Sequence, residues 1–183
     1  MPTKKSLETV RRVNFESFQK AKGQQARATD FDTLRQFEDS LISRGYPEAT
    51  RAAFLATAYN EMGKAGAASK GIGGNGILGL NEYRMPLRLL GNTPIIRGKQ
   101  IHHILEDVTH VYTGKHKQAG NWNDGGSGGP KIMNGQDGSK QFWSSNDPYN
   151  ATVILNKSYI RPKLKSDWNI RGNDARMMMK HMK

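Results

Sequence analysis

The 183-residue sequence contains no cysteine, so neither disulfide bonds nor thiolate catalysis is available to it. It also has no apolar run long enough to cross a membrane as a helix. Its first residues, 1–12, are polar and basic and lack the apolar core of a signal peptide. Secretion by the standard route is therefore not expected, which suits a protein that is carried in a particle or released by lysis.

Acidic residues are scarce relative to basic ones. The 28 lysines and arginines outnumber the 16 aspartates and glutamates and give a net charge of +12. Two partners fit this excess: nucleic acid, whose phosphates attract lysine and arginine, and the anionic bacterial envelope. The charge alone does not distinguish them. The length and the lack of an obvious repeat favour one globular domain.

The most informative stretch begins with a helix predicted over residues 47–62, where apolar residues recur at helical spacing. Pro47 suits the first turn and Gly63 the position after the last. Glu61 then lies on the last turn, where the unpaired carbonyls of the helix end carry partial negative charge. With partial desolvation, this position raises the pKa of a carboxyl group and prepares it for general acid catalysis near neutral pH.

Helical patterns recur at 30–45, 94–111 and 148–159, and Ser166 or Asp167 can cap a last helix that carries Ile170, Ala175 and Met178. The sequence therefore predicts a mostly α domain with long glycine-rich loops and at most a small β-hairpin, within the 63–84 loop. The basic segment 1–28 reads as an arm or linker, which leaves 29–183 as the folded domain.

Several short motifs together carry a family resemblance. They are Asn60-Glu61-Met62-Gly63, Gly76-Ile77-Leu78-Gly79-Leu80, Arg84, the 123–128 segment, Ala151-Thr152, the 159–162 segment and the 171–175 segment. This pattern resembles the phage tail lysozymes, which are related to goose-type lysozymes and lytic transglycosylases. Gly79 and Leu80 depart from it, because such sequences often carry Gln and Trp there.

The resemblance implies a lysozyme-like fold and cleavage of the glycan strand of peptidoglycan, with Glu61 as the general acid and no cofactor. It implies a virion location, in a phage tail or an injected protein, with other tail or virion proteins as further partners. The implied substrate contacts in the matching segments are Asn60, Gly76, Tyr83 and Arg84.

The glycine-rich segment 114–147 supplies further candidate contacts. Aromatic rings stack on the C–H faces of sugars, and Asn and Asp side chains bind hydroxyl groups, so Trp122, Asn123 and Asp124 are candidate glycan contacts. Phe142 and Trp143 are instead expected to anchor the loop to the core.

The mechanism depends on a second carboxylate. A retaining hydrolase places it about 5–5.5 Å from the acid, and an inverting one about 6.5–9.5 Å. Glu82 and Asp124 are the main candidates and Asp147 a weaker one, whereas the transglycosylase route needs none. The sequence leaves these routes open.

Two other functions compete with this prediction. A basic virion or nucleic-acid-binding protein could keep a lysozyme-like fold without activity. The second competing function is that of a zinc-dependent hydrolase, because His103, Glu106 and His110 share a helix face, with His102 and His116 nearby. Their order does not match the His-Glu-x-x-His motif, so a polar helix face is favoured and no metal site is predicted.

Overall fold

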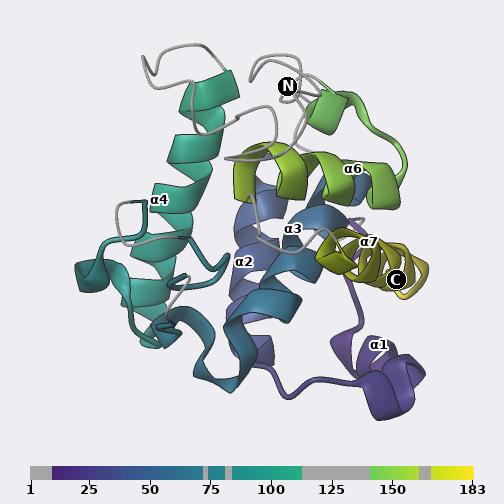
Figure 1. The fold of residues 1–183 in the computed structure, drawn as a ribbon, viewed down its shortest axis with the longest axis horizontal. Helices are drawn as coiled ribbons and strands as arrows, with labels where there is room; N and C mark the ends of the chain where they lie inside the picture. The colour runs from purple at the N-terminus through teal and green to yellow at the C-terminus, as the bar shows by residue number, and fades with distance from the viewer. Residues whose placement is uncertain (1–9, 72–73, 81–83, 113–140, 161–165) are drawn as a thin grey trace.

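The computed structural model describes residues 10–71, 74–80, 84–112, 141–160 and 166–183. These residues are mostly helical and form no β-sheet, as the sequence predicts (Figure 1). In chain order the elements are α1 (Phe15–Lys22), η2 (Gly23–Gln25), α2 (Phe31–Ser43), α3 (Glu48–Met62), η3 (Gly63–Ala68), η4 (Leu87–Leu89), α4 (Pro94–Tyr112), α6 (Pro148–Leu155), the π-helical turn η6 (Asn156–Ile160) and α7 (Ser166–Lys180).

The helix ends follow local capping chemistry. The Asp30 carboxylate accepts hydrogen bonds from the first backbone N–H groups of α2, and Asp147 does the same for α6. Gly45 and Gly63 follow α2 and α3 with φ of 76° and 55°, a conformation that side chains disfavour. The predicted boundaries of these helices are therefore close to those observed.

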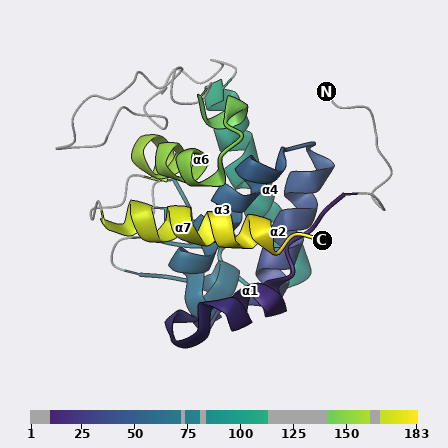
Figure 2. The same ribbon diagram turned by 90° about the vertical axis from the view of Figure 1, so that its right-hand side faces the viewer.

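The centre of the fold is α3, against which α2, α6 and α7 pack (Figures 1 and 2). The sequence predicts one buried face, but α3 is buried around most of its circumference, and only Glu48 at its start and Asn60 and Glu61 at its end are partly exposed. Its alanines, such as Ala52, Ala53 and Ala56, let neighbouring helices approach closely. The helices α6 and α7 pack against α3 and against each other.

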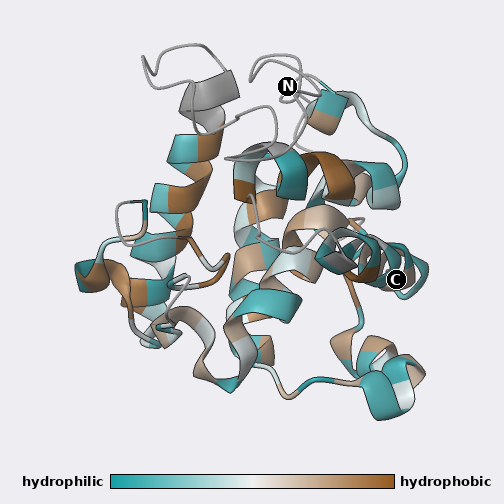
Figure 3. Cartoon of the chain, viewed as in Figure 1, coloured by the Kyte–Doolittle hydropathy of each residue, from teal (hydrophilic) through white to brown (hydrophobic). Residues whose placement is uncertain are grey.

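The helix α4 lies at one side of this bundle and is amphipathic. Figure 3 shows polar and apolar residues alternating along it. Ile101, Ile104, Leu105 and Val108 are buried, as their spacing predicts. Within the described ranges, no helix combines the length and apolar character needed to span a bilayer.

The N-terminal segment differs from the predicted arm or linker over residues 10–22, whereas residues 23–28 are mostly exposed. Phe15 and Phe18 of α1 are buried in the hydrophobic core, and Val13 forms an isolated antiparallel bridge with Met182. The buried Glu38 carboxylate accepts a hydrogen bond from the Val13 N–H at 2.9 Å. The folded unit therefore begins before residue 29. The sequence does not predict this burial, because only a few apolar positions interrupt the polar residues of the segment.

The loop after α3 is held by isolated bridges in place of a sheet. Asn75 pairs with both Lys70 and Leu80, and the Gly76 N–H donates to the Ser69 carbonyl at 2.7 Å.

Phe142 is fully buried and Trp143 packs on Tyr46 with ring centroids 4.4 Å apart. This confirms that Phe142 and Trp143 anchor their segment to the core.

The burial of α1 can be tested by replacing Phe18 with alanine. Because Phe18 is fully buried, we expect the Phe18→Ala variant to lower the free energy of unfolding by about 3–5 kcal/mol. Urea denaturation followed by circular dichroism measures this loss. The control is Lys20→Ala on an exposed position of the same helix, which should change the stability by less than about 0.5 kcal/mol. Equal, small effects of both substitutions would restore the arm interpretation.

Candidate active site

Glu61 lies on the last turn of α3, where the chain leaves the core. Gly63 ends the helix, and its carbonyl accepts a hydrogen bond from the Asp30 N–H at 3.1 Å. The Glu61 side chain is 21% exposed, so the carboxylate is largely buried but still reaches solvent. The carboxyl group lies at the helix end that the sequence predicts, and its restricted access to water meets the condition for a raised pKa.

Arg171 of α7 is the main partner of Glu61. Its Nη2 donates a short hydrogen bond to Oε1 of Glu61 and forms an ion pair with it. The Arg171 side chain is only 7% exposed. Because a buried guanidinium without a counter-charge is costly, the two groups hold each other in place.

A buried amide fixes the other edge of the Arg171 guanidinium. Nη1 of Arg171 donates to Oδ1 of Asn156 at 2.7 Å. The Asn156 amide in turn donates to Oγ1 of Thr57 at 3.0 Å and to the Thr152 carbonyl at 2.9 Å. Thr57 belongs to α3, one turn before Glu61, so this network joins α3, α6 and α7 around a single orientation of the carboxylate.

The 63–84 loop, which follows α3, comes close to the Glu61 carboxylate at Gly79. Gly79 has φ of 61°, and a Cβ atom at this position would overlap Oε2 of Glu61. No side chain can therefore occupy position 79 without displacing the carboxylate. This explains physically why the chain carries glycine where resembling sequences often carry Gln.

Gln100 of α4 holds this loop in place. Its buried side chain accepts a hydrogen bond from the Ile77 N–H and donates to the Ala67 and Leu89 carbonyls, each at 2.8 Å. A Cβ atom on Gly76 would lie 2.6 Å from Oε1 of Gln100. Gly76 is thus a buried turn residue, and the approach of Gln100 leaves no room for a side chain there.

Burial raises the pKa of Glu61 above its ordinary value of 4.5. The charge and the hydrogen bond of Arg171 oppose this rise, and Arg27 opposes it weakly. The negative charge of Asp167 favours the protonated form and adds to the rise. The net direction is upward, which is the direction that a general acid requires.

Asn60 has a structural partner next to the site. Its amide donates to Oδ2 of Asp174 at 2.9 Å, and Oδ1 of Asp174 accepts from Lys22 at 2.6 Å. The Lys22 and Asp174 side chains are 8% and 3% exposed, so this ion pair is buried. It links α1, α3 and α7 behind Glu61. Asn60 is therefore part of this support, whereas the family resemblance implies a substrate contact for it.

Arg84 also has structural partners. Its Nη1 donates to the Tyr159 carbonyl at 2.8 Å, and its guanidinium lies 4.4 Å from the centre of the Tyr159 ring. Burial raises the pKa of Tyr159, whose hydroxyl donates to Asp107 at 2.6 Å.

Five further predicted site residues lie outside the described residues: Glu82, Tyr83, Trp122, Asn123 and Asp124.

The histidines of α4 are engaged separately. Nε2 of His103 donates to the Arg84 carbonyl at 2.8 Å, and Glu106 pairs with Arg44 at 3.1 Å. The side chains of His110 and His116 are outside the described part of the chain. Within that part, no three His, Cys, Asp or Glu side chains come together as metal ligands would.

Arg171 and Asp167 belong to the site, although the sequence motifs assign neither of them a role there. Arg171 shares a helix face with the core residues Ala175 and Met178, at spacings of four and seven. An arginine on a core-facing stripe must find a buried acceptor, and this signal points to a carboxylate partner. Asp167 precedes Arg171 by one helical turn on the same face.

Comparison of the chain with protein-family profiles, with curated proteins and with solved structures found no match. The site described above therefore stands on its own geometry.

The raised pKa of Glu61 can be measured by following its side-chain carboxyl signal by NMR as a function of pH. We expect a midpoint above 4.5 in the wild type and a higher one in Arg171→Gln, because the substitution removes the favourable positive charge. Arg176→Gln removes an exposed charge from the same helix and should leave the midpoint unchanged. A midpoint at or below 4.5 in the wild type would contradict this assignment.

The raised pKa of Glu61 also makes the stability of the fold depend on pH. A carboxyl group that binds its proton more tightly in the folded state stabilises the fold below its unfolded pKa. This contribution is lost as the pH rises from about 4.5 through the raised value. We expect the Glu61→Gln variant to lack that part of the decline, which chemical denaturation at a series of pH values would reveal. Identical pH profiles for the two proteins would contradict the prediction.

Proposed function

We propose that the protein cleaves the glycan strand of bacterial peptidoglycan, with Glu61 as the general acid. One observation carries the proposal: the Glu61 carboxyl has a raised pKa, reaches solvent, and is held in one orientation by Arg171. A general acid needs a proton near neutral pH and a fixed position beside the leaving oxygen. The resemblance of the surrounding sequence to phage tail lysozymes names the substrate.

The two oxygens of Glu61 have different roles in this proposal. Oε1 accepts the hydrogen bond from Arg171, so the proton belongs on Oε2. Oε2 lies against Gly79 of the 63–84 loop. Oε2 would protonate the glycosidic oxygen as the bond breaks. The Arg171 guanidinium would then stabilise the carboxylate that is left, because its charge lowers the energy of the ionised form.

The route after bond cleavage depends on the second carboxylate. Asp167 acts electrostatically on Glu61 and joins Glu82 and Asp124 as a candidate. Asp147 is otherwise engaged, since it caps α6 and pairs with Arg176 at 3.4 Å. A transglycosylase would need no second carboxylate, because the substrate's own groups complete the reaction. We propose a location in a phage tail or injected particle, acting on the host envelope.

The second candidate function is a non-catalytic basic virion protein that binds nucleic acid. The net charge of +12 favours it. In that case the Glu61–Arg171 pair would serve only to lock α3 to α7. Binding would weaken steeply with added salt, and Glu61 would be dispensable for it.

The deciding experiment is mass spectrometry of purified peptidoglycan after incubation with the wild type and with Glu61→Gln. We expect soluble fragments from the wild type and a loss of rate of about 10²–10⁴-fold in the variant, because the amide cannot donate a proton in the same way. The control is Glu48→Gln, which changes the same residue type on the first turn of α3. It should retain the wild-type rate.

The fragments also identify the reaction. Reducing ends would identify a hydrolase and direct attention to Asp167, Glu82 and Asp124. Anhydro-muramyl ends would identify a transglycosylase. An absence of soluble fragments from several wall types, with salt-sensitive DNA binding, would replace the enzymatic proposal with the second candidate.

A further inference from the structure

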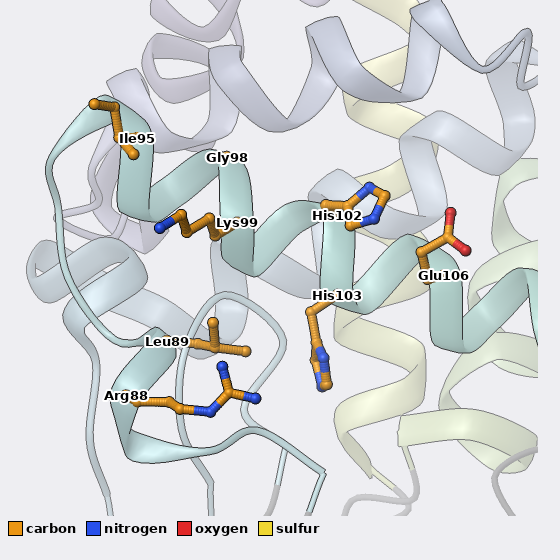
Figure 4. A pocket seen from close by; sticks show the side chains of 8 residues that line it. All are labelled: Arg88, Leu89, Ile95, Gly98, Lys99, His102, His103 and Glu106. Atoms are coloured by element: carbon orange, nitrogen blue, oxygen red, sulfur yellow. The ribbon is translucent and has the colours of Figure 1, made fainter.

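A second surface feature lies apart from Glu61, on α4 and η4. It is an open groove with a volume of about 770 Å³. We name it the α4 groove, and it is lined by Arg88, Leu89, Ile95, Gly98, Lys99, His102, His103 and Glu106. Figure 4 shows the Leu89 side chain between those of Lys99 and Arg88 in that view. Its volume falls in the range of sites that bind small organic ligands.

The charges of the α4 groove are unbalanced. Glu106 is its acidic lining residue, and Arg44 already neutralises it at 3.1 Å. Arg88 and Lys99 are exposed, and neither side chain forms an ion pair or a hydrogen bond with another residue in the described part of the chain. Among the described residues, the groove therefore presents two cations whose charge no carboxylate neutralises.

The α4 groove also has an apolar component. Ile95 is 73% exposed, and Leu89 forms part of the lining although its side chain is largely buried. Aliphatic side chains beside two cations suit a ligand that has carboxylates on an aliphatic backbone. His103 is held by the Arg84 carbonyl, so the lining is partly preorganised.

We propose that the α4 groove binds the acidic stem peptide of peptidoglycan, through its carboxylates at Arg88 and Lys99 and its alanine side chains at Leu89 and Ile95. This inference rests on the proposed function, because it takes the wall polymer as the substrate. Charge-assisted hydrogen bonds from arginine and lysine to carboxylates are stronger than neutral ones. The groove would hold the enzyme on the polymer while the glycan strand meets Glu61.

The test measures peptide binding directly, with no need for cleavage. The probe is the synthetic peptide N-acetyl-L-Ala-γ-D-Glu-L-Lys-D-Ala, titrated into ¹⁵N-labelled full-length protein and followed by NMR. We expect chemical shift changes at residues of the α4 groove, and a Kd about tenfold higher in the double variant Arg88→Gln/Lys99→Gln, which corresponds to about 1.4 kcal/mol. The same peptide with both carboxylates amidated should bind the wild type as weakly as the free peptide binds the variant.

The matched control is Lys20→Gln/Lys180→Gln, which removes the same two charges from exposed positions of α1 and α7. It should keep the wild-type Kd. Equal weakening in both double variants, or equal binding of the amidated peptide, would overturn the proposal, because either result would assign the attraction to overall charge or to apolar contact alone. Shifts at the groove with a DNA oligonucleotide but not with the peptide would also overturn it.

The outcome is separable from that of the proposed function. Glu61→Gln should bind the peptide as the wild type does, because Glu61 does not line the α4 groove. Peptide binding without glycan cleavage would leave the groove assignment standing and remove the catalytic one. Cleavage that depends on Glu61, without peptide binding, would do the reverse.

Discussion

The burial of α3 around most of its circumference is the constraint on which the rest of the structure depends. A helix of this kind needs small residues where neighbours approach and must be covered on every side, and α2, α6 and α7 pack against it. Polar side chains inside it can be satisfied by its own backbone, as when Thr57 donates to the Ala53 carbonyl at 2.8 Å. Glu61 lies at its C-terminal end, where the helix meets water again.

Charges that lie this close to the core must be paired, and the pairs define how the helices meet. Glu61 with Arg171 joins α3 to α7, and Asp174 with Lys22 joins α7 to α1. Such pairs need not add much to the free energy of folding, because desolvation offsets their attraction. Breaking one partner is costly, however, so each pair favours one arrangement of the helices over others. The orientation of Glu61 is a consequence of that selection.

Hydrogen bonds of the Gln100 side chain hold the 63–84 loop against α4. This side chain bonds to the loop near Gly76 and to the carbonyl of Leu89, which lines the α4 groove. The region beside Glu61 and the proposed peptide groove are thus attached to the same buried residue. A polymer with both a glycan strand and acidic peptides offers something to each of them, which is why the two proposals support one another while remaining separately testable.

Local sequence signals determined the helices, because capping residues, glycine stops and apolar spacing act over a few neighbouring positions. Asp30, Asp147 and Gly63 sufficed to place three helix ends, and the placement of Glu61 at the end of α3 followed from them. Only the tertiary structure decided what each polar side chain meets. Asn60, Gly76 and Arg84 contact Asp174, Gln100 and Tyr159, which are distant in sequence, and Arg171 reaches Glu61 across 110 positions. Val13, Phe15 and Phe18 joined the core for the same reason: burial depends on which surfaces meet after folding, and composition along the chain does not record that.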